Sequence, residues 1–345
     1  MTFILLLFLC VCIYNSKFSG INNYFEDYLS LEKTTSIKGI FILLVFFSHF
    51  GSYVEFNSIF DLHYVKLRSL WGQTIVTMFL FYSGYGILES INKKSNYIDN
   101  MPVKRILKTL LDFDIAVIIF LIVQILLGKE YGIKKIVLSL IGWDGIGNSN
   151  WFIFSILITY IFTYVAFSVY KNNILKSIVA VSLLTIIFIG FMRIYRESYW
   201  YNTTFCYVIG MWYWYLKEKI EKLFLESNRT YVFSLGMFVL LFIMSHKYLK
   251  NFFMYELWIL SFVMIVTLVT MKISFNNSIL QWLGKNLFGL YILQRIPMIV
   301  FKFYNIDKIN IYLYFTLSFI TTIIIAAIFN NLTKKIKLTG YKKIN

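Results

Sequence analysis

A histidine within a long apolar run is the first residue of this sequence that could perform chemistry. The stretch SIKGIFILLVFFSHFGSYV covers residues 36–54, in which Lys38 precedes the apolar run and His49 lies inside it. In a helix, about 1.5 Å and 100° per residue place the imidazole roughly 16 Å beyond Lys38 and on nearly the same face. An ionisable group near the middle of a bilayer is costly unless it faces protein or a water-filled cavity. His49 is therefore either a hydrogen-bonded packing residue or a functional one, and its alignment with Lys38 favours function.

Two further apolar runs carry polar residues that could line the same cavity as His49. In TIVTMFLFYSGYGILES, Ser83, Gly84 and Gly86 form a notch of small residues, where a neighbouring helix or a ligand can approach closely. In LGKNLFGLYILQRIPMIV, the residues Tyr291, Gln294 and Arg295 share one side of a helix because they are spaced i, i+3 and i+4. An arginine at that depth needs an anion or a carbonyl partner. We therefore predict that these polar side chains face a central cavity.

A basic cluster precedes the third long apolar run. The segment MPVKRILKTLLDFD places Lys104, Arg105 and Lys108 at the start of a helix. Basic residues at the cytoplasmic end of a membrane helix fix topology and need no ligand. The same residues at the mouth of a cavity can instead hold phosphate groups, such as those of coenzyme A. The segment alone does not decide between these two interpretations.

The composition shows that membrane helices must position these residues. Hydrophobic residues make up 59% of the 345 residues, charged residues make up 14%, and the mean hydropathy is +0.69. Soluble domains are usually about 45–50% apolar, so we predict an all-α polytopic membrane protein embedded in a lipid bilayer. The net charge of +16 fits basic loops that set topology, and we predict no nucleic-acid partner. The three cysteines have neither disulfide nor metal-ligand spacing, and we predict no metal site.

Ten apolar runs have about the length that a membrane span requires. They cover residues 39–56, 71–90, 106–127, 151–170, 175–194, 203–217, 230–246, 255–272, 283–303 and 311–332. A shorter run at 2–14 predicts an extra N-terminal helix, since it lacks the basic start and small-residue cleavage site of a signal peptide.

The chain is expected to have three parts. Residues 1–35 would form the N-terminal hydrophobic helix and a cytoplasmic connector, residues 36–332 the transmembrane domain, and residues 333–345 a basic cytoplasmic tail. When alternate loops are assigned to opposite sides, the side of this tail carries about twice as many Lys and Arg as the other. We therefore predict a multi-pass protein of the plasma membrane with a cytoplasmic C-terminus.

The stretches quoted above resemble, in order, the signature motifs of the acyltransferase-3 family of integral membrane acyltransferases. IKGIFILLVFFSH resembles the motif that leads from an arginine–glycine pair to a histidine, and FLFYSGYG resembles the Ser-Gly-Phe/Tyr motif. VKRILKTLL, WFIFSIL and LGKNLFGLYILQ are similar to the later motifs, so the resemblance covers about residues 36–332. Two positions depart from the family pattern: Lys38 replaces an arginine and Gln294 replaces a histidine. Lysine at the first position also occurs in the branch that resembles fucose 4-O-acetylases and other polysaccharide acetylases.

The resemblance implies a membrane O-acyltransferase that moves an acyl group, most often acetyl, from cytoplasmic acyl-CoA to a hydroxyl of a cell-envelope polysaccharide or its lipid-linked precursor. It implies that His49 is the catalytic histidine, either as general base or as a transient carrier of the acyl group. Lys38, Arg105 and Lys108 would then hold the phosphates of acetyl-CoA. Ser83 and Gly84 would border the acyl tunnel, while Tyr291 or Gln294 could polarise the thioester carbonyl.

An acceptor glycan would need a sugar-binding surface on the outer side. Aromatic residues predicted there are Trp71, Trp143, Trp151, Tyr199, Trp200 and Tyr201. Most of them also fit an interfacial aromatic belt. The loop WDGIGNSNW is the exception we favour, because Asp144 and Asn148 could bind sugar hydroxyls beside Trp151.

Two other functions fit the same sequence. A polysaccharide transporter or export component could use similar helices and a polar cavity, but it would need no site for CoA phosphates. An acyltransferase acting on a peptide or a lipid amine would differ from the favoured function only in its acceptor, which the sequence does not decide.

Overall fold

A computed structural model of the chain describes residues 1–56, 58–171, 173–336 and 338. The described chain is built almost wholly of helices, with two short strands. The long helices are α2 (Leu31–Phe50), α4 (Thr74–Lys93), α6 (Lys108–Leu126), α8 (Trp151–Tyr170), α9 (Ile174–Tyr195), α10 (Phe205–Leu225), α11 (Asn228–His246), α12 (Phe252–Lys272) and α17 (Ile311–Lys335). The short helices are α1 (Thr2–Ile13), α3 (Leu62–Trp71), α5 (Tyr97–Met101), α7 (Ile133–Leu140), α13 (Ser278–Lys285), α14 (Leu287–Leu293), α15 (Arg295–Phe303) and α16 (Ile306–Ile309).

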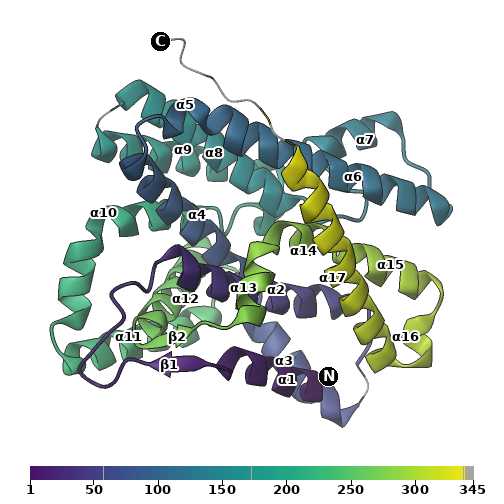
Figure 1. Ribbon diagram of the computed structural model, residues 1–345, viewed down its shortest axis with the longest axis horizontal. Helices are drawn as coiled ribbons and strands as arrows, with labels where there is room; N and C mark the ends of the chain where they lie inside the picture. Colours follow the sequence, from purple (N-terminus) through teal and green to yellow (C-terminus); the bar gives the residue numbers. More distant parts are fainter. Residues whose placement is uncertain (57, 172, 337, 339–345) are drawn as a thin grey trace.

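The fold is the predicted all-α polytopic membrane protein. Within the described residues, seven helical stretches are long and apolar enough to cross a membrane, of which Tyr97–Leu126 joins α5 and α6. The helices α2 and α10 occupy two of the other expected spans, but each carries more polar residues along its length. Figure 1 shows α6, α8 and α9 along one edge of the molecule and α1 with the strands along the opposite edge.

The ninth expected span, 283–303, differs from the prediction because it is divided into α13, α14 and α15. Pro297 explains the second break: it cannot donate to the carbonyl four residues before it, and its ring clashes there, so the helix is interrupted at Gln294. At the first break, the Nδ2 of Asn330 on α17 donates to the carbonyl oxygen of Asn286 over 3.2 Å and to its Oδ1 over 3.0 Å. A neighbouring helix thus satisfies backbone that the break releases.

The N-terminal run forms a helix, but α1 has only 12 residues and would extend about 18 Å. That length is too short for a typical bilayer span. Its Phe8 ring instead packs edge-on against Phe47 of α2, with centroids 5.5 Å apart. The connector after α1 contains strand β1 (Ser16–Phe18), which pairs antiparallel with β2 (Ile273–Phe275) and was not predicted. The predicted basic tail, 333–345, lies mostly outside the described residues.

Four glycines allow two helix pairs to pack with their backbones in close contact. A Cβ on Gly84 would lie 1.9 Å from the carbonyl oxygen of Tyr207, and a Cβ on Gly210 would lie 2.0 Å from that of Phe81. Each of the helices α4 and α10 therefore packs a glycine against the backbone of the other. Gly39 and Gly284 form an equivalent crossing between α2 and α13. Small residues permit such close approach of membrane helices. The two crossings fix α2 and α4, which carry Lys38 and Ser83.

Candidate active site

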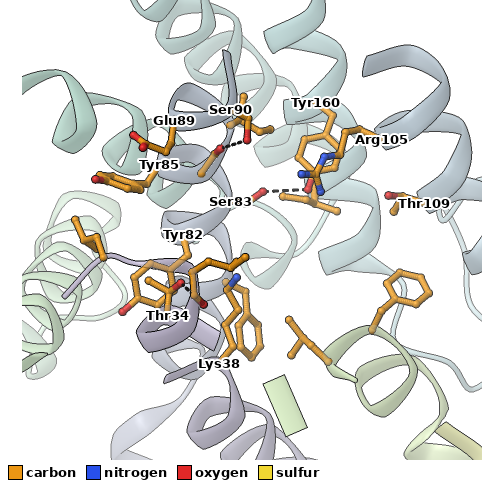
Figure 2. Close-up of a pocket in the computed structure, with 18 of the residues that line it drawn as sticks. Thr34, Lys38, Tyr82, Ser83, Tyr85, Glu89, Ser90, Arg105, Thr109 and Tyr160 are labelled. Atoms are coloured by element: carbon orange, nitrogen blue, oxygen red, sulfur yellow. Dashed lines mark hydrogen bonds between the residues drawn. The ribbon is translucent and has the colours of Figure 1, made fainter. Parts of the chain in front are cut away.

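A cavity of about 630 Å³ lies between α2, α4, α8, the start of α14 and the helical turn η2 (Pro102–Leu107). Polar side chains from four of these elements point into it, as Figure 2 shows. They include Lys38 of α2, Ser83 and Glu89 of α4, Arg105 of η2 and Tyr160 of α8. Apolar residues complete the wall, so the cavity suits a ligand with charged and apolar parts.

Four cations line this cavity, among them Lys38 of α2 and Arg105 of η2. The Nζ of Lys38 lies 5.9 Å from the ring centroid of Tyr82, and the Nε of Arg105 donates to the hydroxyl of Tyr97 over 2.9 Å. The two groups are close enough to repel each other. Neither forms an ion pair with any carboxylate of the described chain. Like charges that share a cavity without an acidic partner favour an anionic ligand.

The π-helical turn explains how Arg105 reaches the cavity. Pro102 begins this turn and lacks an N–H group, so the ordinary α-helical hydrogen bonding is disturbed here. The turn carries Lys104 and Arg105 but leaves Lys108 in the first turn of α6. Short π-helical segments often occur at functional sites because they redirect side chains.

Lys108 does not line the cavity. Its Nζ pairs with the Oδ1 of Asp112 at 2.5 Å and donates to the carbonyl oxygen of Thr333 on α17 over 2.8 Å. These contacts tie α6 to the end of α17 and occupy the charge that was predicted to hold phosphate. The predicted role of Lys108 in CoA binding therefore has no support from its position.

Of the two residues predicted to border the acyl tunnel, Ser83 and Gly84, only Ser83 lines the cavity. Its Oγ lies 3.0 Å from the hydroxyl of Tyr160. Gly84 faces the opposite way and packs against the backbone of α10. Gly86 takes the place that was expected for Gly84, because it lines the cavity and a Cβ there would meet nothing within 4 Å.

His49 lies at the end of α2, where its ring is partly exposed. The sequence placed it near the middle of a span over 39–56, but α2 runs from Leu31 to Phe50 and puts it in the last turn. His49 is not part of the cavity wall. The buried ring of Tyr291 does line the cavity, and its centroid lies 6.4 Å from that of His49. Tyr291 therefore stands between the cavity and the imidazole.

The wall between the cavity and His49 is aromatic. The ring centroids of Tyr291 and Phe152 lie 5.1 Å apart, and those of Phe152 and Phe79 lie 6.0 Å apart. The buried Nδ1 of His49 has no hydrogen-bond partner in the described protein. A buried polar atom without a partner is costly in a protein that needs it only for packing. This observation favours a functional imidazole over a packing one.

Gln294 and Arg295 lie beside Tyr291 but have different partners. The Nε2 of Gln294 donates to the carbonyl oxygen of Tyr291 over 3.0 Å, while its buried Oε1 has no partner among the described atoms. The Nε of Arg295 donates to the hydroxyl of Tyr53, beyond the end of α2, over 3.0 Å. Neither residue lines the cavity. Both belong to the side of Tyr291 on which His49 lies.

The loop WDGIGNSNW lies close to this same side. Gly147 packs against Ile299 of α15, and the buried Ser149 lies beside the hydroxyl of Tyr291. Asn148 is buried: its Oδ1 accepts from the backbone of Ile146 over 3.0 Å, and its Nδ2 has no partner in the described chain.

The two other loop residues predicted to bind substrate take part in local contacts. The Oδ1 of Asp144 accepts from the N–H of Gly145 over 2.7 Å. The ring of Trp151 packs edge-on against Tyr199, with centroids 6.3 Å apart. None of the three predicted loop residues lines the cavity.

Comparison with known proteins decides the general class of this molecule. A family model described as an acyltransferase domain, Acyl_transf_3, matches residues 35–331. The chain belongs to the acyltransferase-3 family. It is therefore a membrane acyltransferase, and the matched range contains His49, Tyr291 and most of the cavity wall. No curated protein and no solved structure gives a significant match to the chain.

Several residues of this acyltransferase site were missed from the sequence. Tyr97, Phe152 and Tyr160 lie in apolar or interfacial segments, where aromatic residues are common and carry no spacing signal. Glu89 was a detectable signal, since it is an acidic residue near the end of an apolar run. Its carboxylate pairs with Lys93 at 2.7 Å and accepts from the Nε1 of Trp214 over 2.7 Å, which keeps an acidic group at the mouth of the cavity.

Proposed function

We propose that this membrane acyltransferase moves an acetyl group from cytoplasmic acetyl-CoA to a hydroxyl of a cell-envelope polysaccharide or of its lipid-linked precursor. The observation that carries the proposal is the arrangement of charges: Lys38 and Arg105 face a cavity without an acidic partner in the described chain, and an imidazole whose Nδ1 has no hydrogen-bond partner lies beside Tyr291 of the cavity wall. The resemblance to polysaccharide acetylases supports the choice of acetyl donor and glycan acceptor.

The donor would occupy the cavity with its phosphates at Lys38 and Arg105. Arg105 uses its Nε on Tyr97, so its terminal nitrogens remain for phosphate oxygens. Eleven helical residues separate Lys38 from His49, which is about 16 Å along α2. A donor bound by its phosphates must therefore carry its acyl group on a long arm. The pantetheine arm of CoA meets this requirement, and the apolar part of the cavity wall can cover it.

The transfer would take place at Tyr291, between the cavity and His49. In one route, His49 accepts the proton of the acceptor hydroxyl while that oxygen attacks the thioester carbonyl. The hydroxyl of Tyr291 could donate to the carbonyl oxygen as negative charge develops on it. The C–S bond then breaks, and the CoA thiolate leaves and takes the proton from His49. In the second route, His49 first receives the acyl group from CoA and then passes it to the hydroxyl.

The acceptor would approach from the side of Tyr291 opposite to the cavity. Asn148 and Gln294 each have a buried polar atom there without a partner in the described protein. Such atoms can bond the hydroxyls of a sugar at no further cost of desolvation. On this proposal the protein lies in the plasma membrane, with the cavity mouth and the C-terminus on the cytoplasmic side.

Transfer of radiolabel from acetyl-CoA in membranes that contain the protein tests the reaction directly. Hydroxylamine-sensitive label in the glycan fraction, absent from membranes without the protein, is the expected result. If CoA does not bind and no label is transferred, acetyl-CoA is not the donor and the transporter interpretation gains support. If CoA binds but no label moves, the acyl group or the acceptor class is wrong.

The variant Arg105→Gln should weaken the affinity for acetyl-CoA by roughly tenfold or more, because a charge-assisted contact to phosphate is lost. Lys108→Gln provides the matched control, since both changes remove one positive charge from the same helical segment. Lys108 lies outside the cavity wall, so its variant should keep the affinity of the wild type. Equilibrium binding to the purified protein measures both. Equal losses in the two variants would contradict the assignment of Arg105.

A further inference from the structure

A second group of cations surrounds the end of α2 and lies outside the cavity wall. Arg68 of α3 donates from Nη1 to the carbonyl oxygen of Gly51 over 2.6 Å and from Nη2 to the Oγ of Ser52 over 2.9 Å. Arg295 of α15 donates to the hydroxyl of Tyr53, and Lys302 of α15 donates to its carbonyl oxygen over 2.6 Å. Three positive charges thus meet at the three residues that follow α2.

The partners of these cations are all neutral. Across the described residues, none of Arg68, Arg295 and Lys302 forms an ion pair with a carboxylate. The nearby Asp61 is paired with the amino group of Met1 instead. The guanidinium groups also keep donors that these contacts do not use, because Arg295 engages only its Nε. The cluster therefore has both charge and hydrogen-bond donors available for an anion.

This cluster is part of the surroundings of His49. Gly51 and Ser52 follow His49 directly in the chain, and the N–H of Ser52 donates to the carbonyl oxygen of His49 over 2.9 Å. Arg68 and Arg295 are both close enough to repel a positive charge on the imidazole. An anion bound at the cluster would compensate these two positive charges beside His49.

The donor cannot supply that anion, because its phosphates are held at the other end of α2. Lys38 and Arg105 line the cavity, whereas Arg68, Arg295 and Lys302 do not. Along α2, Lys38 lies about 16 Å from His49, beside which the second group of cations gathers. The anion must therefore arrive from the side from which the acceptor approaches.

We propose that the acyl acceptor itself carries an anionic group, a carboxylate or a phosphate, which Arg68, Arg295 and Lys302 bind beside His49. This inference rests on the proposed function, since it names the chemical class of the acceptor. Charged groups of opposite sign would select and orient the acceptor so that a neighbouring hydroxyl reaches the imidazole. A neutral glycan would lack both the attraction and the compensation of charge.

Equilibrium binding of two matched oligosaccharides tests the proposal without requiring turnover. The protein is placed in nanodiscs of phosphatidylcholine, and the probes are labelled oligomers of glucose and of glucuronic acid of equal length. The wild type should bind the glucuronic acid oligomer at least about tenfold more tightly, with a preference that shrinks as salt is raised. Arg295→Gln and Arg68→Gln should each reduce the preference several-fold, and Arg295→Lys should restore part of it.

Lys66→Gln is the control, because Lys66 is an exposed basic residue on the same short helix as Arg68 and its side chain forms no ion pair in the described chain. It should leave the preference unchanged. Retained melting temperature and CoA affinity show that a variant is folded. Equal binding of the two oligomers by a folded wild type would overturn the proposal, as would equal losses of preference in the Lys66 and Arg295 variants.

Two further outcomes show whether the anionic-acceptor proposal or the proposed acetyl transfer is wrong. If adding phosphatidylglycerol to the nanodiscs abolishes binding of the charged oligomer and glycan acetylation continues, the cluster holds a lipid phosphate and the proposal is wrong. If the charged oligomer binds selectively but acetyl-CoA transfers no label to it or to any glycan, the anion site stands and the proposed reaction fails. The two proposals can thus be rejected separately.

Discussion

Replacing His49 with alanine should lower the rate of acetyl transfer by roughly 10²–10⁴-fold, the range that a positioned general acid or base usually contributes. The binding of acetyl-CoA should be nearly unchanged, because His49 is not part of the cavity wall. The expected loss is thus in kcat, with little change in the KM for the donor. His63→Ala is the matched control, since His63 is exposed on α3 and should tolerate the change. Full activity of a folded His49 variant would exclude both proposed routes.

The same variant can distinguish the two routes that involve His49. If the imidazole carries the acetyl group, wild-type protein incubated with labelled acetyl-CoA and no acceptor should retain label, and His49→Ala should not. If the imidazole acts only as a general base, neither protein should be labelled. The position of His49 behind Tyr291 makes this measurement informative, because a covalent route requires the thioester to pass the aromatic wall. Label on the protein at another residue would show that a different nucleophile operates.

The residues with unusual chemistry in apolar segments were the ones that the sequence could identify. A charged or imidazole group costs free energy in a membrane helix, so Lys38, His49 and Arg295 stand out against their neighbours without any structural knowledge. The structure places Lys38 in the cavity wall and His49 beside Tyr291. The order of the helices was equally accessible, since span length and apolar composition are set by the bilayer itself.

The sequence could not show where a helix ends within an apolar run. His49 was placed near the middle of the bilayer because the span was taken to begin just after Lys38, yet α2 begins at Leu31 and ends at Phe50. The polar N-terminal turns of α2 are buried against other helices, so composition gave no reason to include them. Tertiary packing, and not local pattern, decides that boundary. The same holds for Lys108, whose ion pair with Asp112 is visible as i,i+4 spacing but whose contact with α17 is not.

The roles of individual glycines were also hidden from the sequence. Gly84 and Gly86 both follow Ser83 on α4, and only the neighbouring helices distinguish them. A helix turns by about 100° per residue, so residues two positions apart, such as Gly84 and Gly86, point to nearly opposite faces. The notch was correctly recognised as a place of close approach, but the residue that borders the cavity is Gly86 and the one that packs against α10 is Gly84.

This pair permits a sharp test of the fold. Gly84→Ala should destabilise the protein by about 1–3 kcal/mol or more, because its Cβ would lie 1.9 Å from the carbonyl oxygen of Tyr207 and 2.9 Å from the carbonyl carbon. Both atoms belong to the backbone of α10, so the clash cannot be relieved by turning a side chain. The two helices would have to separate. Since Ser83 precedes this position, the wall of the cavity would move with α4, and the affinity for acetyl-CoA should fall as well.

Gly86→Ala is the matched control, because it adds the same methyl group to the same helix where nothing lies within 4 Å. Alanine is favoured over glycine in a helix interior by about 0.5–1 kcal/mol, so this variant should melt at the same temperature as the wild type or higher. Its methyl group would enter the cavity, which makes any loss of CoA affinity in this variant a steric effect without loss of stability. Thermal unfolding of both purified variants decides the matter. Equal melting temperatures for the Gly84 and Gly86 variants would mean that α4 and α10 do not pack backbone to backbone, and the cavity wall they form would have to be placed differently.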